Sequence, residues 1–457
     1  MDVLEKALNG VAGYYNIAFI LLFLVLSIFF FLSLLKKKYD NAFIYFLFVI
    51  PIAIKTPNFY TIYERNSFYI PVNEGLTFYS IYLILFLLSI RKDYFFLVIF
   101  NTLRKKKLIL IGFITVLSFG ITQQLALPVD FGFLLAYNKI IDPFFFTVIA
   151  SYIFFKYNQK LETLTIWIVF SILYSILFSI ISGLAINYDY LGVLRFGGGS
   201  IGSSTIAGAI FVTWAIICLG TFFTSKNENL KSLFAILFGI LSFCALMAHT
   251  RGPLGYFAIG IFLLLGNLLK YIKNKIIGIM ILLMPILILI LFKPVSNEIF
   301  KRNFDLNKIN EDGSFNERIK RNAEAFKLIS ESPLKGIGFA NPKSGERGKE
   351  EFEVYFHVYN TPLAWATYGG IFSGIGFVLI NIIIFKFSFK KSRYLHQNNN
   401  VSKIFRITLI CWFIDYFTTG NDLLFGYPFT AVVYFYLILG IIIGNFVYIS
   451  KYERSVM

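Results

Sequence analysis

Four arginines stand out in this 457-residue chain as groups that could bind a phosphate. They are Arg195, Arg251, Arg318 and Arg321. The guanidinium group keeps its charge at any physiological pH and pairs with a phosphate through two parallel hydrogen bonds. Arg318 and Arg321 are three residues apart, so on a helix they lie one turn apart and can face the same group.

Histidine is the residue type best suited to accept a proton, because a neutral imidazole is available near pH 7. The chain has 3 histidines. His357 is followed closely by Tyr359 and Asn360, whose hydroxyl and amide groups could orient a sugar, and His249 lies two residues before Arg251. Carboxylates that could serve as the base instead are Glu350, Glu351 and Glu353.

The elements that must position these residues are membrane-spanning helices. Hydrophobic residues make up 57% of the sequence and charged residues 15%, whereas soluble domains average about 45–50% and about 25%. Apolar runs near the length of a bilayer crossing predict thirteen spans, near 14–35, 41–54, 75–90, 108–124, 133–155, 162–185, 202–223, 232–249, 253–269, 276–292, 361–385, 404–418 and 429–450. The composition excludes a soluble enzyme, a disordered chain and a disulfide scaffold.

We therefore predict an all-α polytopic integral membrane protein with about 12–13 transmembrane helices and one large loop that contains a helix. Residues 1–292 hold the first ten helices, residues 293–360 form the loop, and residues 361–457 hold the last three.

The net charge of +17 is explained by topology. With the N-terminus outside, the inside segments carry 24 lysines and arginines and the short outside segments carry six, a bias typical of cytoplasmic loops. This predicts a multi-pass protein of the cytoplasmic membrane with membrane lipids, and not nucleic acid, as its partners. The loop 293–360 and all four arginines fall on the outside.

The loop contains one predicted helix, which should end before Pro333. Its apolar residues at spacings of three and four form one apolar stripe; they are Ile319, Ala323, Phe326 and Ile329. Gly336 and Gly338 then indicate a tight turn.

The sequence gives little support for a metal site or for redox chemistry. The outside segments contain no DxD pair or other acidic cluster with the pattern of a metal site, so we expect no metal site and no cofactor. Cys218, Cys244 and Cys411 lie inside apolar runs without a CxxC spacing, which predicts three packed thiols.

Three pieces of sequence, taken in order, resemble the O-antigen ligase and O-antigen polymerase superfamily. The first is RFGGGSIGSSTIAGA, which begins at Arg195, and the second is HTRGPLGYFAIG, which contains Arg251. The third is the loop pattern of arginine, helix, SPLKGIG, histidine and asparagine, followed by a helix containing Tyr-Gly. The resemblance covers roughly 195–385. The superfamily usually has Asn or Asp directly after the histidine, whereas Val358 and Tyr359 stand between His357 and Asn360.

The resemblance implies a fold like that of the type C glycosyltransferases and a metal-independent, inverting glycosyltransferase of the bacterial inner membrane. Such an enzyme moves a glycan from undecaprenyl diphosphate to an acceptor sugar on the periplasmic face. Its acceptor is lipid A-core in a ligase and a second lipid-linked glycan in a polymerase; the ligase is our leading interpretation. The implied roles are catalysis by His357, diphosphate binding by the four arginines, and sugar binding by Tyr359, Asn360 and His249.

Other interpretations stay open at this point. An arginine at a span end can be a snorkelling anchor, and Arg318 and Arg321 can simply solvate an amphipathic helix. His357 can pack against the loop. A polysaccharide flippase or other transporter is the alternative from a different functional class, although the sequence shows no convincing repeat of two halves and its charges cluster at the outside ends of the spans.

Overall fold

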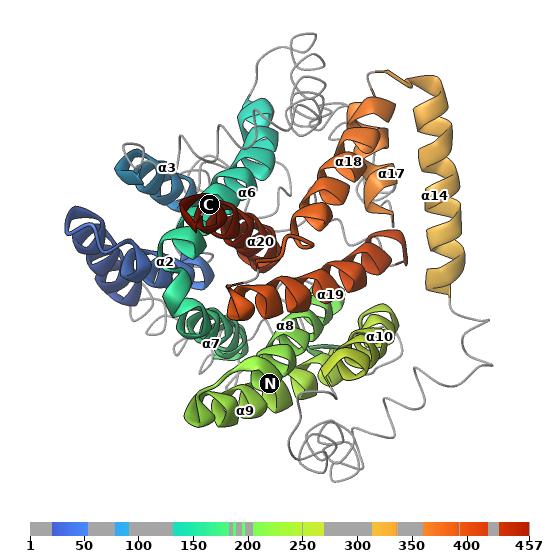
Figure 1. Ribbon diagram of the computed structural model, residues 1–457. Coiled ribbons are helices and arrows are strands. Elements are labelled where there is room, and N and C mark those ends of the chain that lie inside the picture. Colours follow the sequence, from blue (N-terminus) through green and yellow to red (C-terminus); the bar gives the residue numbers. More distant parts are fainter. Residues whose placement is uncertain are drawn as a thin grey trace, which may run out of the picture.

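The computed structural model describes residues 21–53, 78–90, 131–181, 186–188, 194–196, 204–248, 250–268, 313–334, 336, 360–392, 394–418 and 429–456. Helices dominate these residues (Figure 1). Four described segments are long and apolar enough to cross a membrane, namely Asn158–Phe178, Ile206–Thr224, Glu228–Met247 and Val433–Glu453. Shorter apolar helices include Leu21–Leu35 and Gly252–Leu264. The predicted all-α membrane protein is confirmed.

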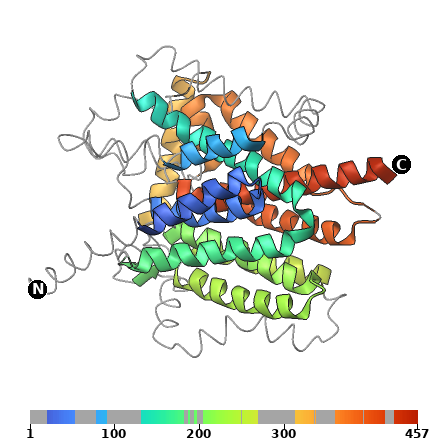
Figure 2. The ribbon, with the colours of Figure 1, turned by 90° about the vertical axis from the view of Figure 1, so that its left-hand side faces the viewer.

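The helices pack as a bundle whose long members run roughly side by side (Figure 2). Its first part contains α2 (Tyr39–Ala53), α3 (Phe78–Ile90), α6 (Phe131–Lys156), a short 3-10 turn and α7 (Leu161–Ile181). Its middle part contains α8 (Ser204–Thr224), α9 (Glu228–Met247) and α10 (Arg251–Leu268), and the C-terminal part contains α19 (His396–Thr418) and α20 (Phe429–Val456). Within this bundle α8 packs along α9, α10 packs on α8 and α19, and α20 packs along α6.

Small residues allow the closest of these crossings. A Cβ atom on Gly440 or Gly444 of α20 would lie closer than 3.0 Å to atoms of Ala150 or Ser151 of α6. Two glycines four residues apart let helix backbones approach directly, which is how helices associate in lipid. Between the helices the core is filled by large buried side chains such as Trp214, Trp412 and Tyr434.

One end of the bundle is tied together by polar contacts between segments predicted to be inside. Lys160 pairs with Asp40 at 2.7 Å, which joins the α6–α7 connection to the start of α2. Lys390 pairs with Glu453 at 2.6 Å, which joins the segment after residue 387 to the end of α20.

Asparagine side chains extend these contacts. The Asn398 amide donates to the side-chain oxygens of Asn158 at 2.8 Å and Asn445 at 2.6 Å. The predicted inside segments near 38, 158, 398 and 453 therefore meet at the same end of the bundle, as the charge bias requires.

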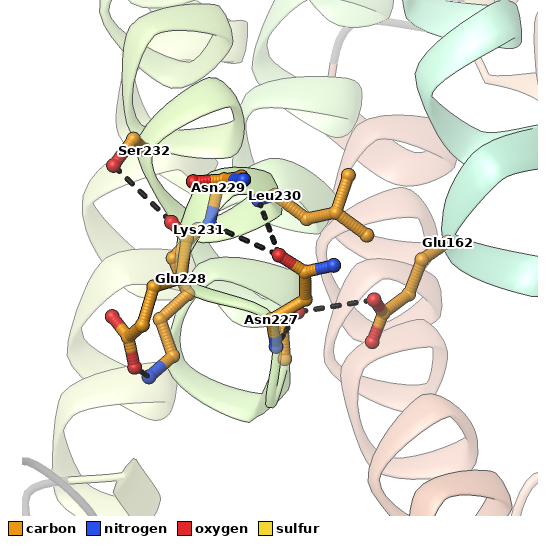
Figure 3. Close-up of polar contacts among 8 residues, drawn as sticks. Glu162, Asn227, Glu228, Asn229, Leu230, Lys231 and Ser232 are labelled. Carbon is orange, nitrogen blue, oxygen red and sulfur yellow. Dashed lines mark hydrogen bonds and ion pairs between the residues drawn. The ribbon is translucent and has the colours of Figure 1, made fainter.

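The loop between α8 and α9 lies beside the start of α7, close in sequence to Lys160, and Figure 3 shows their contact. Asn227 caps α9, because its side-chain oxygen accepts from the backbone N–H groups of Asn229 and Leu230. Glu162 of α7 accepts from the Ser225 hydroxyl at 3.0 Å, so α7 holds the loop in place.

At the opposite end, α14 (Gly313–Glu331) lies across the direction of the long helices (Figures 1 and 2). The predicted loop helix is thus present and ends before Pro333. It packs on α17 (Thr361–Gly369), which α18 (Ile371–Phe387) follows in the chain. The sequence predicts one span over 361–385, but the structure breaks it at Gly370, whose φ of 83° an L-residue rarely adopts.

Candidate functional site

The turn between α9 and α10 carries Arg251, the first residue of α10. Thr250 is buried, and its carbonyl accepts from Leu254 N at 3.2 Å, which begins the helix. Gly208 of α8 lies against this turn, and a Cβ there would lie closer than 3.0 Å to Thr250 Oγ1 and at 3.3 Å from Ala248 Cβ. A glycine is therefore needed at position 208 for α8 to pack this closely against the Thr-Arg-Gly turn.

A short hairpin brings Arg195 to the same end of α8 and α9. Strands β1 (Ile186–Tyr188) and β2 (Leu194–Phe196) pair antiparallel, with Arg195 opposite Asn187. β2 contacts α8 and α9. The hairpin was not predicted, because two three-residue strands carry too little alternation to stand out from the apolar spans around them. Arg195 and Arg251 thus lie on two elements that both contact α8 and α9; their side chains lie outside the described part of the structure.

The arginines of α14 lie on the face that packs against the protein. Arg318 and Arg321 are both half-buried, and Ala325, seven residues after Arg318, is fully buried. The apolar stripe points away from this packed face, because Ile319 is 56% exposed and Phe326 is 64% exposed. The packed side of this helix is the arginine side, and it faces α17.

A glycine at the α17–α18 break anchors the end of α14. The Ile371 N–H donates to the Pro333 carbonyl at 2.8 Å, and the Leu334 carbonyl lies against the Cα of Gly370. In the turn that follows α14, the Gly336 N–H donates to the Ser332 carbonyl at 2.8 Å, and Gly336 has a φ of 66°. The SPLKG turn therefore docks on the break between α17 and α18 at Gly369-Gly370. The resemblance had related these two sequence motifs only by their order along the chain.

Asn360 has a structural role that its predicted role as a sugar ligand overlooked. Its side-chain oxygen accepts from Leu363 N at 3.0 Å, so it is the N-cap of α17, and Pro362 follows in the first turn. The Asn-Thr-Pro sequence is a helix-start signal that could have predicted this. The Asn360 amide nitrogen is not used by the cap, so sugar binding stays a prediction.

Several predicted site residues lie outside the described residues, namely His249, His357, Tyr359, Glu350, Glu351 and Glu353. Cys218, Cys244 and Cys411 are free and buried, which confirms the prediction of packed thiols. Among the residues that the structure describes, no group of three or more His, Cys, Asp or Glu could hold a metal ion.

The three motif pieces fall within or beside one recognisable domain. The family model for O-antigen ligase matches residues 235–380. The chain carries an O-antigen ligase domain. A search of curated proteins found no match.

The O-antigen ligase domain runs from within α9 through α10, α14 and α17 into α18. It therefore includes Arg251, both arginines of α14, the docking contact at Gly370 and His357. Arg195 precedes it, on the hairpin that contacts α9. The resemblance drawn from the motifs is confirmed, and the function is of the O-antigen ligase or polymerase type, acting on lipid-linked glycans.

Proposed function

We propose that this protein is an O-antigen ligase of the bacterial inner membrane, which transfers a glycan from undecaprenyl diphosphate to lipid A-core on the periplasmic side. The observation that carries the proposal is the match to O-antigen ligase over residues 235–380, a stretch that contains Arg251, Arg318 and Arg321. The opposite end holds the segments predicted to be cytoplasmic, tied by the Lys160–Asp40 and Lys390–Glu453 pairs.

In the proposed reaction the acceptor hydroxyl oxygen bonds to the anomeric carbon while the bond from that carbon to the diphosphate oxygen breaks. A single displacement of this kind inverts the anomeric centre. The acceptor proton passes to His357, and the electron pair leaves with the diphosphate. Arg195, Arg251, Arg318 and Arg321 are the proposed ligands of the leaving diphosphate, because fixed positive charge stabilises negative charge that develops in the transition state. No metal ion has a step in this scheme.

Glycan analysis of a deletion strain tests the proposed acceptor. Loss of a ligase leaves full-length lipid-linked polymer and a bare lipid A-core, because the polymer is made but not transferred. Complementation with the wild-type gene should restore long glycans on the core. A core that instead carries a single repeat would identify the protein as a polymerase, whose acceptor is a second lipid-linked glycan. Unchanged glycans would contradict both assignments.

Thiol labelling tests the proposed sidedness. A cysteine at Glu331, exposed near the end of α14, should react with a membrane-impermeant maleimide in cells with a permeabilised outer membrane. A cysteine at Tyr394, which is 64% exposed and lies between α18 and α19, should react only after the inner membrane is disrupted. The buried native cysteines give little background. The reverse pattern would contradict the periplasmic site.

A further inference from the structure

Side chains of α14 that lie seven residues apart form strips along the helix, and four of these strips differ clearly in character. Residues seven apart lie two turns apart on the same side of a helix. Arg318 and Ala325 form the packed strip against α17. The other three strips are the pairs Ile319 and Phe326, Lys320 and Lys327, and Glu324 and Glu331.

The apolar strip is left uncovered by the described part of the protein. Ile319 and Phe326 are more exposed than most apolar residues of a folded chain, although α14 packs firmly on its other side. The lysine strip is exposed about a quarter-turn around the helix from it, and the glutamate strip borders the lysines, because Glu324 and Glu331 each follow a lysine by four residues. An apolar strip on one flank and a charged face that begins with lysines are the arrangement of a helix that lies in a membrane surface.

The exposed apolar surface continues from α14 onto a helix of the bundle. Leu334 directly follows the Pro333 that binds Ile371 N, and its side chain is 57% exposed. Ile371, Phe372 and Ile375 at the start of α18 are also exposed. α18 is an apolar helix of 17 residues, close to the shortest length that crosses the hydrocarbon core of a bilayer. Its exposed isoleucines and phenylalanine are therefore expected to face lipid.

The orientation of α14 fits the same setting. It lies at the edge of the bundle and runs across the long helices, so that it is parallel to the plane that those helices cross (Figures 1 and 2). Its C-terminal end is fixed at the first residue of α18. A helix held at this place meets the bilayer along its flank.

We propose that α14 is an interfacial helix whose apolar strip, Ile319 and Phe326, is embedded in the bilayer surface and continues the lipid-facing side of α18. Lys320 and Lys327 lie at the level of the lipid headgroups, and Glu331 faces water. The helix is then held by protein on its arginine side and by lipid on its apolar side. This arrangement does not depend on which glycan or acceptor the protein uses.

Spin labelling in nanodiscs of phosphatidylethanolamine and phosphatidylglycerol tests the proposal. Cysteine is introduced at Phe326 or Ile319, with Glu331→Cys as the matched control on the same helix. A nitroxide at position 326 or 319 should be severalfold more accessible to oxygen, relative to a water-soluble nickel chelate, than the nitroxide at position 331. The native cysteines are buried in α8, α9 and α19 and give little labelling.

Two results would overturn the proposal. Preferential access of the nickel chelate at both apolar positions would mean that the strip faces water. An immobile nitroxide shielded from both reagents would mean that protein covers the strip, either another part of the chain or a second copy. Two independent apolar positions keep the test decisive if one variant fails to fold, and no transfer activity is needed to read it.

Discussion

Replacing His357 by alanine is expected to lower the rate of glycan transfer by about 10²–10⁴-fold, the usual effect of removing a general base. The expectation follows from its chemistry and place. An imidazole can take the acceptor proton near neutral pH, and His357 lies three residues before Asn360, where α17 begins. Binding of the lipid-diphosphate donor should be retained, because the diphosphate is assigned to arginines.

The matched comparison is Arg251→Lys, which keeps the positive charge but loses the two-pronged guanidinium geometry. That variant should lose both donor binding and transfer, whereas His357→Ala loses transfer alone. Donor affinity measured with a purified lipid diphosphate separates the two. Wild-type turnover of His357→Ala, together with a loss in His249→Ala or Glu353→Gln, would move the base to the residue whose replacement inactivates the protein.

The helices could be predicted from the sequence because apolar runs and helix-stop signals depend only on residues that are close together in the chain. The loop helix was expected to end before Pro333, and α14 ends at Glu331. Lysine and arginine counts also predicted which connections lie together, as the Lys160–Asp40 pair illustrates. These features depend on neighbouring residues or on summed charge, both of which a sequence displays directly.

The orientation of α14 could not be predicted from the sequence, because it depends on contacts between residues far apart in the chain. The spacing of Ile319 and Phe326 predicts an apolar stripe, but it does not say whether protein covers that stripe. Next to a membrane, an apolar strip can face lipid and need not face the protein core. The arginine side of α14 can then pack against α17. Which side turns inward depends on tertiary contacts such as the docking of Pro333 on Ile371, and no local pattern encodes those.

Replacing Gly370 by alanine is expected to release α14 from the bundle and thereby abolish most transfer. Gly370 has φ 83° and ψ 167°, a conformation that is essentially restricted to glycine. Its new Cβ would lie closer than 3.0 Å to the carbonyl of Leu334, a backbone atom that cannot rotate away. Strain of this kind costs about 1–3 kcal/mol, so the undocked population should rise roughly 5- to 150-fold. Arg318 and Arg321 would move with the helix.

A cysteine at Ala325, which is fully buried on the packed face of α14, reports the docking directly. With glycine at position 370, this cysteine should react slowly with a maleimide. In the Gly370→Ala background its reaction rate should rise in proportion to the undocked population. Gly255→Ala in α10 is the control, because a Cβ there meets no atom of the described residues within 4 Å and alanine is favoured in a helix. If Gly370→Ala left Ala325→Cys shielded and transfer intact, the contact between the SPLKG turn and the Gly-Gly break would not be what holds the arginine face in place.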